Sequence, residues 1–218
     1  MNLKYIDSVQ ASVGSVYVDE FKRGYFPDSC PPSSHVIMKF PKTDKTKGHV
    51  EVHWMDGGIQ PERPEELGPN EVFGDGGNGT LFIGTKGKMM CSTYGANPRL
   101  LPTSRTNEVH VPQTIPRVPN GAEGHYAQWV EGAIAGYGKK KLSSPFEIAG
   151  PLTEALLMSN LAIRGFDIRK PGANGKGFDY PGRYIELLWD NNSMKVTNLD
   201  DVNQFIKRTY RDGFSLNV

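Results

Sequence analysis

The sequence predicts an α+β fold: one large, mainly antiparallel, open sheet with helices packed on one face. Segments with strand-like alternation of apolar and polar residues fill the first two thirds of the chain, and helix-like segments follow them. Strands and helices that are segregated along a chain favour an antiparallel sheet over an alternating parallel one. With no internal repeat and no evident linker, residues 1–218 are expected to form a single domain.

The strand predictions rest on alternation with a period of two. Residues 8–17, 35–40 and 49–55 alternate in this way, and in the last segment Val50, Val52 and Trp54 share one face while Glu51 and His53 share the other. Residues 80–83 and 88–92 flank the turn sequence 84–87 and predict a tight hairpin. The sheet is therefore expected to be covered on one side only.

Three helices are predicted in the last hundred residues. Asn120 and Glu123 have the spacing of a helix cap, and an apolar stripe follows, formed by Trp129, Val130, Ala133, Ile134 and Tyr137. A second helix is expected from Pro151 to about Arg164, apolar on several sides and therefore buried, with Gly165 as its stop. After a hairpin at 183–189 and 194–197, Asn198 is expected to cap a last helix.

Composition and charge exclude some classes of function. The formal net charge is +1, which gives no reason to expect nucleic acid or an anionic membrane as a partner. No apolar run approaches the roughly 20 residues of a membrane span. The N-terminus has no signal-peptide core and starts as an expressed fragment would, so the compartment stays open. Cys30 and Cys91 are expected to be reduced thiols, with Cys91 in the core.

Two motif matches are rejected on structural context. Residues 74–79 fit G-x-G-x-x-G, but a dinucleotide site needs a strand before this loop and a helix after it, whereas a strand is expected here after Gly79. His49 and His53 have the spacing of zinc ligands on a helix. On a strand the two residues stand about 13 Å apart, so no metal site is predicted and solvent-facing histidines are preferred.

The residues that favour ligand binding lie where strands end. Trp54 and Asp56 precede a long segment rich in Gly and Pro, residues 56–79, and Tyr94, Asn97 and Arg99 follow the hairpin. Aromatic faces and fork-shaped donors of this kind would suit a sugar-sized cleft, although ordinary turn chemistry explains them equally well. His125, in the first turn of its helix, adds an acid–base candidate whose alternative is a structural or solvated histidine.

Several longer segments carry a family resemblance. They are SSHVIMKFP (33–41), VHWMDGGIQPERPEEL (52–67), GTLFIGTKGKMMCSTYGANPRLLP (79–102), GHYAQWVEGAI (124–134) and AGPLTEALLMSNLAIR (149–164). In this order they resemble the C-terminal domain of Gfo/Idh/MocA oxidoreductases, and the resemblance extends over nearly the whole chain.

The resemblance implies the substrate-binding half of a longer enzyme. A full-length member has an N-terminal Rossmann domain that binds NAD or NADP and carries a catalytic lysine. It acts on a sugar or polyol by hydride transfer, and it forms homo-oligomers through the C-terminal sheet. The family's acid–base Asp and His precede the point where this chain begins. The resemblance therefore gives no catalytic, cofactor-binding or metal-binding residue here, and the chain alone is expected to be inactive.

Under this hypothesis the substrate-side residues are Trp54, Asp56, Tyr94, Asn97, Arg99 and His125. Asp56 and Arg99 would bind hydroxyl groups, and Trp54 or Tyr94 would stack on a sugar ring. Two alternatives remain open: a stand-alone carbohydrate-binding or structural domain, and a part of an NAD-dependent glycosidase.

Overall fold

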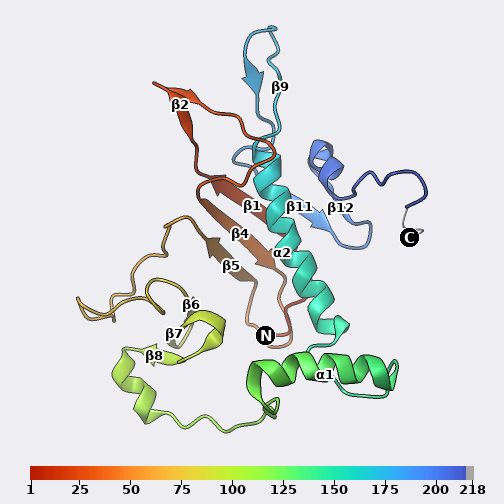
Figure 1. Ribbon diagram of the computed structural model, residues 1–218. Helices are drawn as coiled ribbons and strands as arrows, with labels where there is room; N and C mark the ends of the chain where they lie inside the picture. The colour runs from red at the N-terminus through yellow and green to blue at the C-terminus, as the bar shows by residue number, and fades with distance from the viewer. Residues whose placement is uncertain (215–218) are drawn as a thin grey trace. The chain divides into compact units, whose positions relative to one another are not determined.

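The computed structural model describes residues 1–214 and divides the chain into two compact units (Figure 1). Unit 1 combines residues 1–59 with the residues from Lys141 onward, and unit 2 comprises residues 60–140. Both contain antiparallel sheet and helix, so the chain is an α+β protein. Each unit is described by itself.

The sheet of unit 1 has five strands, all antiparallel to their neighbours, in the order β12-β11-β1-β4-β5. Its central pair, β1 and β4, is in register from Ser8 opposite Lys39 to Val13 opposite Ser34. The predicted strands at 35–40 and 49–55 are confirmed, and so is the late hairpin. The strands are β1 (Ser8–Val13), β4 (Ser34–Phe40), β5 (Val50–Met55), β11 (Leu187–Asp190) and β12 (Lys195–Val196).

One face of this sheet lies against helix α2 (Phe146–Phe166), which crosses it obliquely in Figure 1. The core between them consists of alternate strand residues such as Val9, Val36, Met38 and Leu187, packed with Ala155, Met158, Leu161 and Ala162 of the helix. The intervening strand residues point to the opposite face, which carries polar side chains. The two-residue alternation thus separates a buried face from an open one.

Helix α2 differs from its prediction in two ways. It begins at Phe146 instead of Pro151, and the proline lies inside it, where it removes one backbone hydrogen bond. The helix is also not buried on several sides: Leu152, Leu156 and Leu157 are exposed. The sheet covers only the side of a helix that faces it, and in the described part of unit 1 these leucines stay about half exposed.

Shorter elements complete unit 1. The strand predicted for 8–17 stops at Val13, and after Gly14, whose amide donates to the Ser33 carbonyl at 2.8 Å, the chain enters a small hairpin. Arg169 stacks between the rings of Tyr25 and Phe178, at 3.6 and 4.4 Å from the ring centroids. These elements are β2 (Tyr17–Asp19), β3 (Lys22–Arg23), β9 (Lys170–Pro171), β10 (Phe178–Asp179) and the 3-10 helix η3 (Asp200–Phe205).

The predicted last helix is the 3-10 turn η3, and Asn198 does not cap it. Instead, the Asn198 side chain accepts a hydrogen bond from the Leu188 amide at 2.9 Å and donates one to the Glu186 carbonyl at 2.7 Å. It therefore satisfies one backbone group within β11 and one directly before it, a use of the asparagine side chain that competes with capping.

Unit 2 contains a three-stranded antiparallel sheet, β6-β7-β8. The predicted hairpin is confirmed, with Thr85 and Lys86 as its two-residue loop between Gly84 and Gly87. The stretch 95–120, expected to be irregular, supplies the third strand. A small core of Leu67, Met90 and Leu101 lies beside the sheet. The elements are β6 (Thr80–Gly84), β7 (Gly87–Cys91), η1 (Thr93–Gly95), β8 (Arg99–Leu101), η2 (Thr103–Glu108) and helix α1 (Gly121–Ala135).

Helix α1 forms where it is predicted, but without the predicted cap. Asn120 has a left-handed backbone, φ 59°, and its side chain makes no capping hydrogen bond. None of the fifteen helical residues is buried, so the stripe through Trp129, Val130 and Ile134 stays exposed. None of the helices in the described part of the chain has the length and apolarity to cross a bilayer.

Both cysteines are free thiols, as predicted. Cys30 is exposed, and Cys91 is buried beside the small core of unit 2.

Candidate functional site

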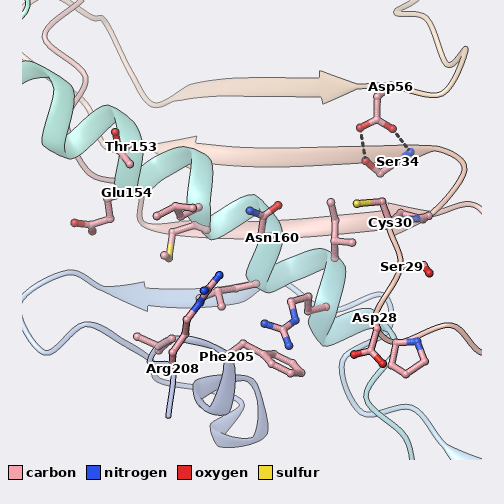
Figure 2. Close-up of a pocket in the computed structure, with 18 of the residues that line it drawn as sticks. Asp28, Ser29, Cys30, Ser34, Asp56, Thr153, Glu154, Asn160, Phe205 and Arg208 are labelled. Atoms are coloured by element: carbon pink, nitrogen blue, oxygen red, sulfur yellow. Dashed lines mark hydrogen bonds between the residues drawn. The ribbon is translucent and has the colours of Figure 1, made fainter. Parts of the chain in front are cut away.

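A groove of about 1270 Å³ in unit 1 is the candidate site. One wall is helix α2, and the other is formed by the loop 27–34 with Asp56 and Gly57; residues at and beyond the end of η3 close a third side (Figure 2). Leu157, Met158 and Leu161 give the groove apolar surface. Its polar lining residues are Asp28, Ser29, Ser34, Asp56, Thr153, Glu154, Asn160, Arg164 and Arg208.

Asp56 is fixed at the end of β5 by hydrogen bonds. Its carboxylate accepts from the Ser34 amide at 2.6 Å, from the Ser34 hydroxyl at 2.9 Å and from the Trp54 indole at 3.2 Å. Gly57 makes this arrangement feasible, because its φ is +65° and a Cβ there would lie 2.1 Å from the Pro32 carbonyl oxygen. Asp56 therefore ties β5 to the start of β4, and its carboxylate lines the groove (Figure 2).

The helix wall carries a second held carboxylate. Glu154 accepts a hydrogen bond from the indole of Trp189 at 2.8 Å, which joins α2 to β11. Thr153, Asn160 and Arg164 are spaced by seven and then four residues along α2, so their side chains lie along one stripe of the helix. This stripe brings a hydroxyl, an amide and a guanidinium group to the groove.

Two arginines supply the positive charge of the groove. The guanidinium of Arg164 lies 3.8 Å from the ring centroid of Phe205, and Arg208 lies beyond η3. Within residues 1–214, neither arginine is in an ion pair with a carboxylate. Both guanidinium groups retain N–H donors for hydrogen bonds to a ligand oxygen, so the groove offers hydrogen-bond donors as well as acceptors.

The six residues predicted as substrate-side fall into both units. Trp54 and Asp56 lie together in unit 1, although the indole N–H of Trp54 is used by Asp56. Tyr94, Asn97, Arg99 and His125 belong to unit 2.

Backbone geometry accounts for part of the second group. Tyr94 and Asn97 have left-handed φ values of 58° and 47°, which is turn geometry. Arg99 donates to the Gly74 carbonyl at 3.0 Å and so holds the glycine-rich loop. His125 lies in the first turns of α1.

Sequence reasoning missed the helix wall of the groove. Thr153, Glu154, Asn160 and Arg164 are polar residues inside an otherwise apolar helix, and that interruption was a readable signal. The prediction that this helix is buried all round removed the reason to look for a ligand there.

The glycine loop 74–79 has the context expected from the sequence. Asp75 and Asn78 form an isolated bridge, and strand β6 follows directly instead of a helix. A Cβ at Gly74 would lie 1.9 Å from the Asn78 carbonyl oxygen, so close backbone packing explains the glycine there.

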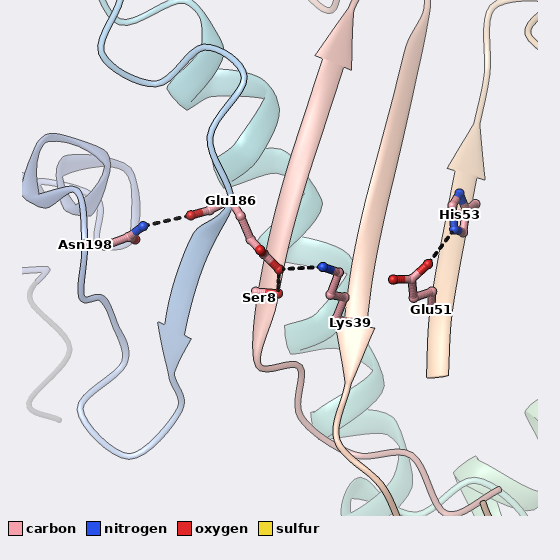
Figure 3. A network of polar contacts seen from close by, with 6 residues as sticks. All are labelled: Ser8, Lys39, Glu51, His53, Glu186 and Asn198. Carbon is pink, nitrogen blue, oxygen red and sulfur yellow. Dashed lines mark hydrogen bonds and ion pairs between the residues drawn. The ribbon is translucent and has the colours of Figure 1, made fainter. Parts of the chain in front are cut away.

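The open face of the unit 1 sheet carries a polar network (Figure 3). Glu186 accepts a hydrogen bond from the Ser8 hydroxyl and lies 3.1 Å from the Lys39 ammonium. Both contacts lower the pKa of Glu186 below its ordinary value of 4.5, and the hydrogen bond from Ser8 has the larger effect. On β5 of the same face, the Glu51 carboxylate lies 3.3 Å from the Nε2 atom of His53.

Comparison with known proteins adds no assignment. No family model matches the chain, and no curated protein sequence matches it.

Proposed function

We propose that this chain is the substrate-binding and oligomerisation domain of an NAD(P)-dependent oxidoreductase that acts on a sugar or polyol, and that it is not active alone. The observation that carries the proposal is the groove of unit 1, where an apolar surface is bordered by hydroxyl, amide, carboxylate and guanidinium groups. The resemblance to Gfo/Idh/MocA C-terminal domains supports the same conclusion independently.

The lining suits a ligand with many hydroxyl groups. Asp56 and Glu154 are held by other side chains and can accept hydrogen bonds from hydroxyls, while Asn160, Arg164 and Arg208 can donate to them. Leu157 offers an apolar surface to the C–H face of a sugar ring. In this arrangement the chain orients the substrate by hydrogen bonds to a rigid helix and two strand ends.

The reaction itself needs a second module. NAD or NADP, bound by a Rossmann domain in the proposed parent enzyme, would supply or accept the hydride. The exposed leucines of α2 outside the groove, Leu152 and Leu156, provide an apolar surface for such a domain. The resemblance also implies assembly of a homo-oligomer through the sheet.

Thermal unfolding of the purified chain tests the substrate part of the proposal. A panel of sugars and polyols at millimolar concentration is expected to contain a compound that raises Tm, since a ligand at 100 times its Kd stabilises by about 2.7 kcal/mol. Asn160→Ala and Arg164→Gln should reduce that rise. Asn192→Ala, in the exposed β11–β12 turn, serves as the matched control and should leave it unchanged.

The same measurement with NAD and NADP tests the cofactor part. Neither dinucleotide is expected to change Tm, because the proposed cofactor site belongs to another domain. A clear rise with NAD would contradict the proposal. The coding sequence upstream gives a second test: an in-frame, glycine-rich strand–turn–helix supports the two-domain enzyme, and a stop codon directly before Met1 favours a stand-alone binding domain.

A further inference from the structure

Two histidines meet on the open face of the unit 1 sheet, away from the groove. His35 lies on β4 and His53 on β5, one diagonal step apart, since His35 is opposite Met55 and His53 is opposite Ile37. The His35 Nε2 and His53 Nδ1 atoms are 3.0 Å apart, and the ring centroids are 5.2 Å apart. The sequence had suggested only His49 as a partner for His53; the strand register supplies His35 instead.

The neighbouring carboxylate decides which nitrogen of His53 is free. Glu51 Oε2 lies 3.3 Å from His53 Nε2, so that nitrogen carries the proton and donates it to the carboxylate (Figure 3). In a neutral imidazole the other nitrogen, Nδ1, then has a lone pair, and it points toward His35. A carboxylate behind an imidazole is the usual outer contact of a metal-binding histidine, because it fixes the tautomer and raises the ligand's basicity.

We propose that His35 Nε2 and His53 Nδ1 together bind a divalent transition-metal ion, with Ni²⁺ and Cu²⁺ preferred over Zn²⁺. Two nitrogens 3.0 Å apart, each about 2.05 Å from a metal, subtend an angle of about 94°. That angle is close to the right angle between adjacent ligands of octahedral and square-planar ions. A tetrahedral zinc ion would need the nitrogens about 3.3 Å apart.

Binding requires a change of tautomer at His35 and a reorientation of the two rings, because the two nitrogens of the hydrogen-bonded pair point toward each other. In the metal-free pair, His35 Nε2–H donates to His53 Nδ1; on binding, that proton leaves Nε2 and the other nitrogen, Nδ1, is protonated, so the net charge of the ring does not change.

The surrounding charges also favour a cation. Glu51 is on the same face, and Lys39, which lies opposite Glu51 on β4, is paired with Glu186. No group of three or more His, Cys, Asp or Glu side chains within residues 1–214 could hold a metal ion, so solvent would complete the coordination. The site is therefore an open, two-nitrogen site, and it does not depend on the proposed function.

Calorimetric titration of the untagged chain with NiCl₂ and with ZnCl₂ tests the proposal. One Ni²⁺ ion per chain is expected to bind, more tightly than Zn²⁺. His53→Ala and His35→Ala should each abolish this binding, and Glu51→Gln should weaken it about tenfold, the low end of the effect of losing such an outer contact. His49→Ala, at the exposed residue directly before β5, is the matched control and should bind as the unchanged chain does.

A spectroscopic measurement separates a built site from scattered binding. The electron paramagnetic resonance spectrum of the one-to-one Cu²⁺ complex is expected to show coupling to two imidazole nitrogens, and His35→Ala is expected to lose this two-nitrogen spectrum. The proposal is overturned if Ni²⁺ binding survives His53→Ala, if His49→Ala weakens it equally, or if the Cu²⁺ spectrum shows no nitrogen coupling. Circular dichroism of each variant verifies that β4 and β5 remain folded.

Discussion

The two units differ in how much of their apolar surface they bury. Unit 1 gathers fourteen buried residues of the described chain into one core between the sheet and α2, whereas unit 2 gathers three beside its small sheet. Helix α1 of unit 2 buries no residue at all. Unit 1 therefore has the core of an independently stable domain, while unit 2 depends on its turns, its hydrogen bonds and whatever covers its apolar stripe.

This difference in buried core between the two units indicates where a ligand site can be held rigidly. In unit 1 the groove residues are attached to elements that the core fixes, such as Glu154 to Trp189 and Asp56 to Ser34. In unit 2 the predicted site residues Tyr94 and Asn97 lie in exposed turns beside a small core. A site on core-supported elements holds its geometry better than one on loops.

The largest expected effect is on the core of unit 1. Leu187→Ala, at a residue only 2% exposed, should destabilise unit 1 by about 2–5 kcal/mol in urea unfolding followed by Trp189 fluorescence. Leu188→Ala, the next residue on the open face, should change stability by less than about 0.5 kcal/mol. Leu101→Ala, in the small core of unit 2, is expected to leave the Trp189 transition in place; a shift equal to that of Leu187→Ala would show that the two units unfold as one.

A smaller effect is expected at the strand ends beside the groove. Asp56→Ala removes an acceptor for three hydrogen bonds and should cost about 1–3 kcal/mol. Ser34→Ala keeps the bond to the backbone amide and should cost less. Hydrogen exchange of the Ser34 amide measures the local effect: it should speed up in Asp56→Ala, and unchanged protection would mean that Asp56 does not hold β4.

Glu186, on the open face of the unit 1 sheet, should make a pH-dependent contribution to the free energy of unfolding that is smaller than the effect of Asp56→Ala. Because the pKa of folded Glu186 lies below 4.5, the unfolded chain binds its proton first as the pH falls. The stabilisation is thus fully present above pH 4.5 and is lost as the pH falls from there through the folded pKa. The stability difference between the unchanged chain and Glu186→Gln, measured by urea unfolding at pH 7, 4.5 and 3, should shrink accordingly, and Ser8→Ala should reduce this dependence. A difference that is constant with pH would contradict the assignment.

The smallest effect on stability is expected on helix α1. Ile134 is 82% exposed, so Ile134→Lys should change the unfolding free energy by no more than about 0.5 kcal/mol. The same change should lower binding of a hydrophobic dye, since it interrupts the stripe with Trp129 and Val130. A loss of stability above about 1 kcal/mol would show that another surface covers the stripe and would reduce the contrast between the units.

Much of the secondary structure could be predicted because it is local. Val50 and Val52 alternate with Glu51 and His53, and a two-residue period leaves little choice but a strand with one buried face. Helix ends were less predictable: Pro151 is favoured at a first helical position, yet Ile148 and Ala149 bond to the Pro145 carbonyl and extend the helix upstream.

The candidate site was predictable only in part. Asp56 was found because it follows a strand directly, whereas Glu154, Asn160 and Arg164 were missed because their helix, apolar on several sides, was expected to be buried.

The sequence by itself determined which residues alternate and where the chain must turn, because these depend on neighbours a few residues away. Tertiary structure alone decided which face of α2 lies on the sheet, and hence which polar residues border a groove. It also decided that His53 meets His35 across the strands and not His49 along its own strand. Pairing between strands and packing between layers join residues distant in sequence, and no local pattern encodes which partners they choose.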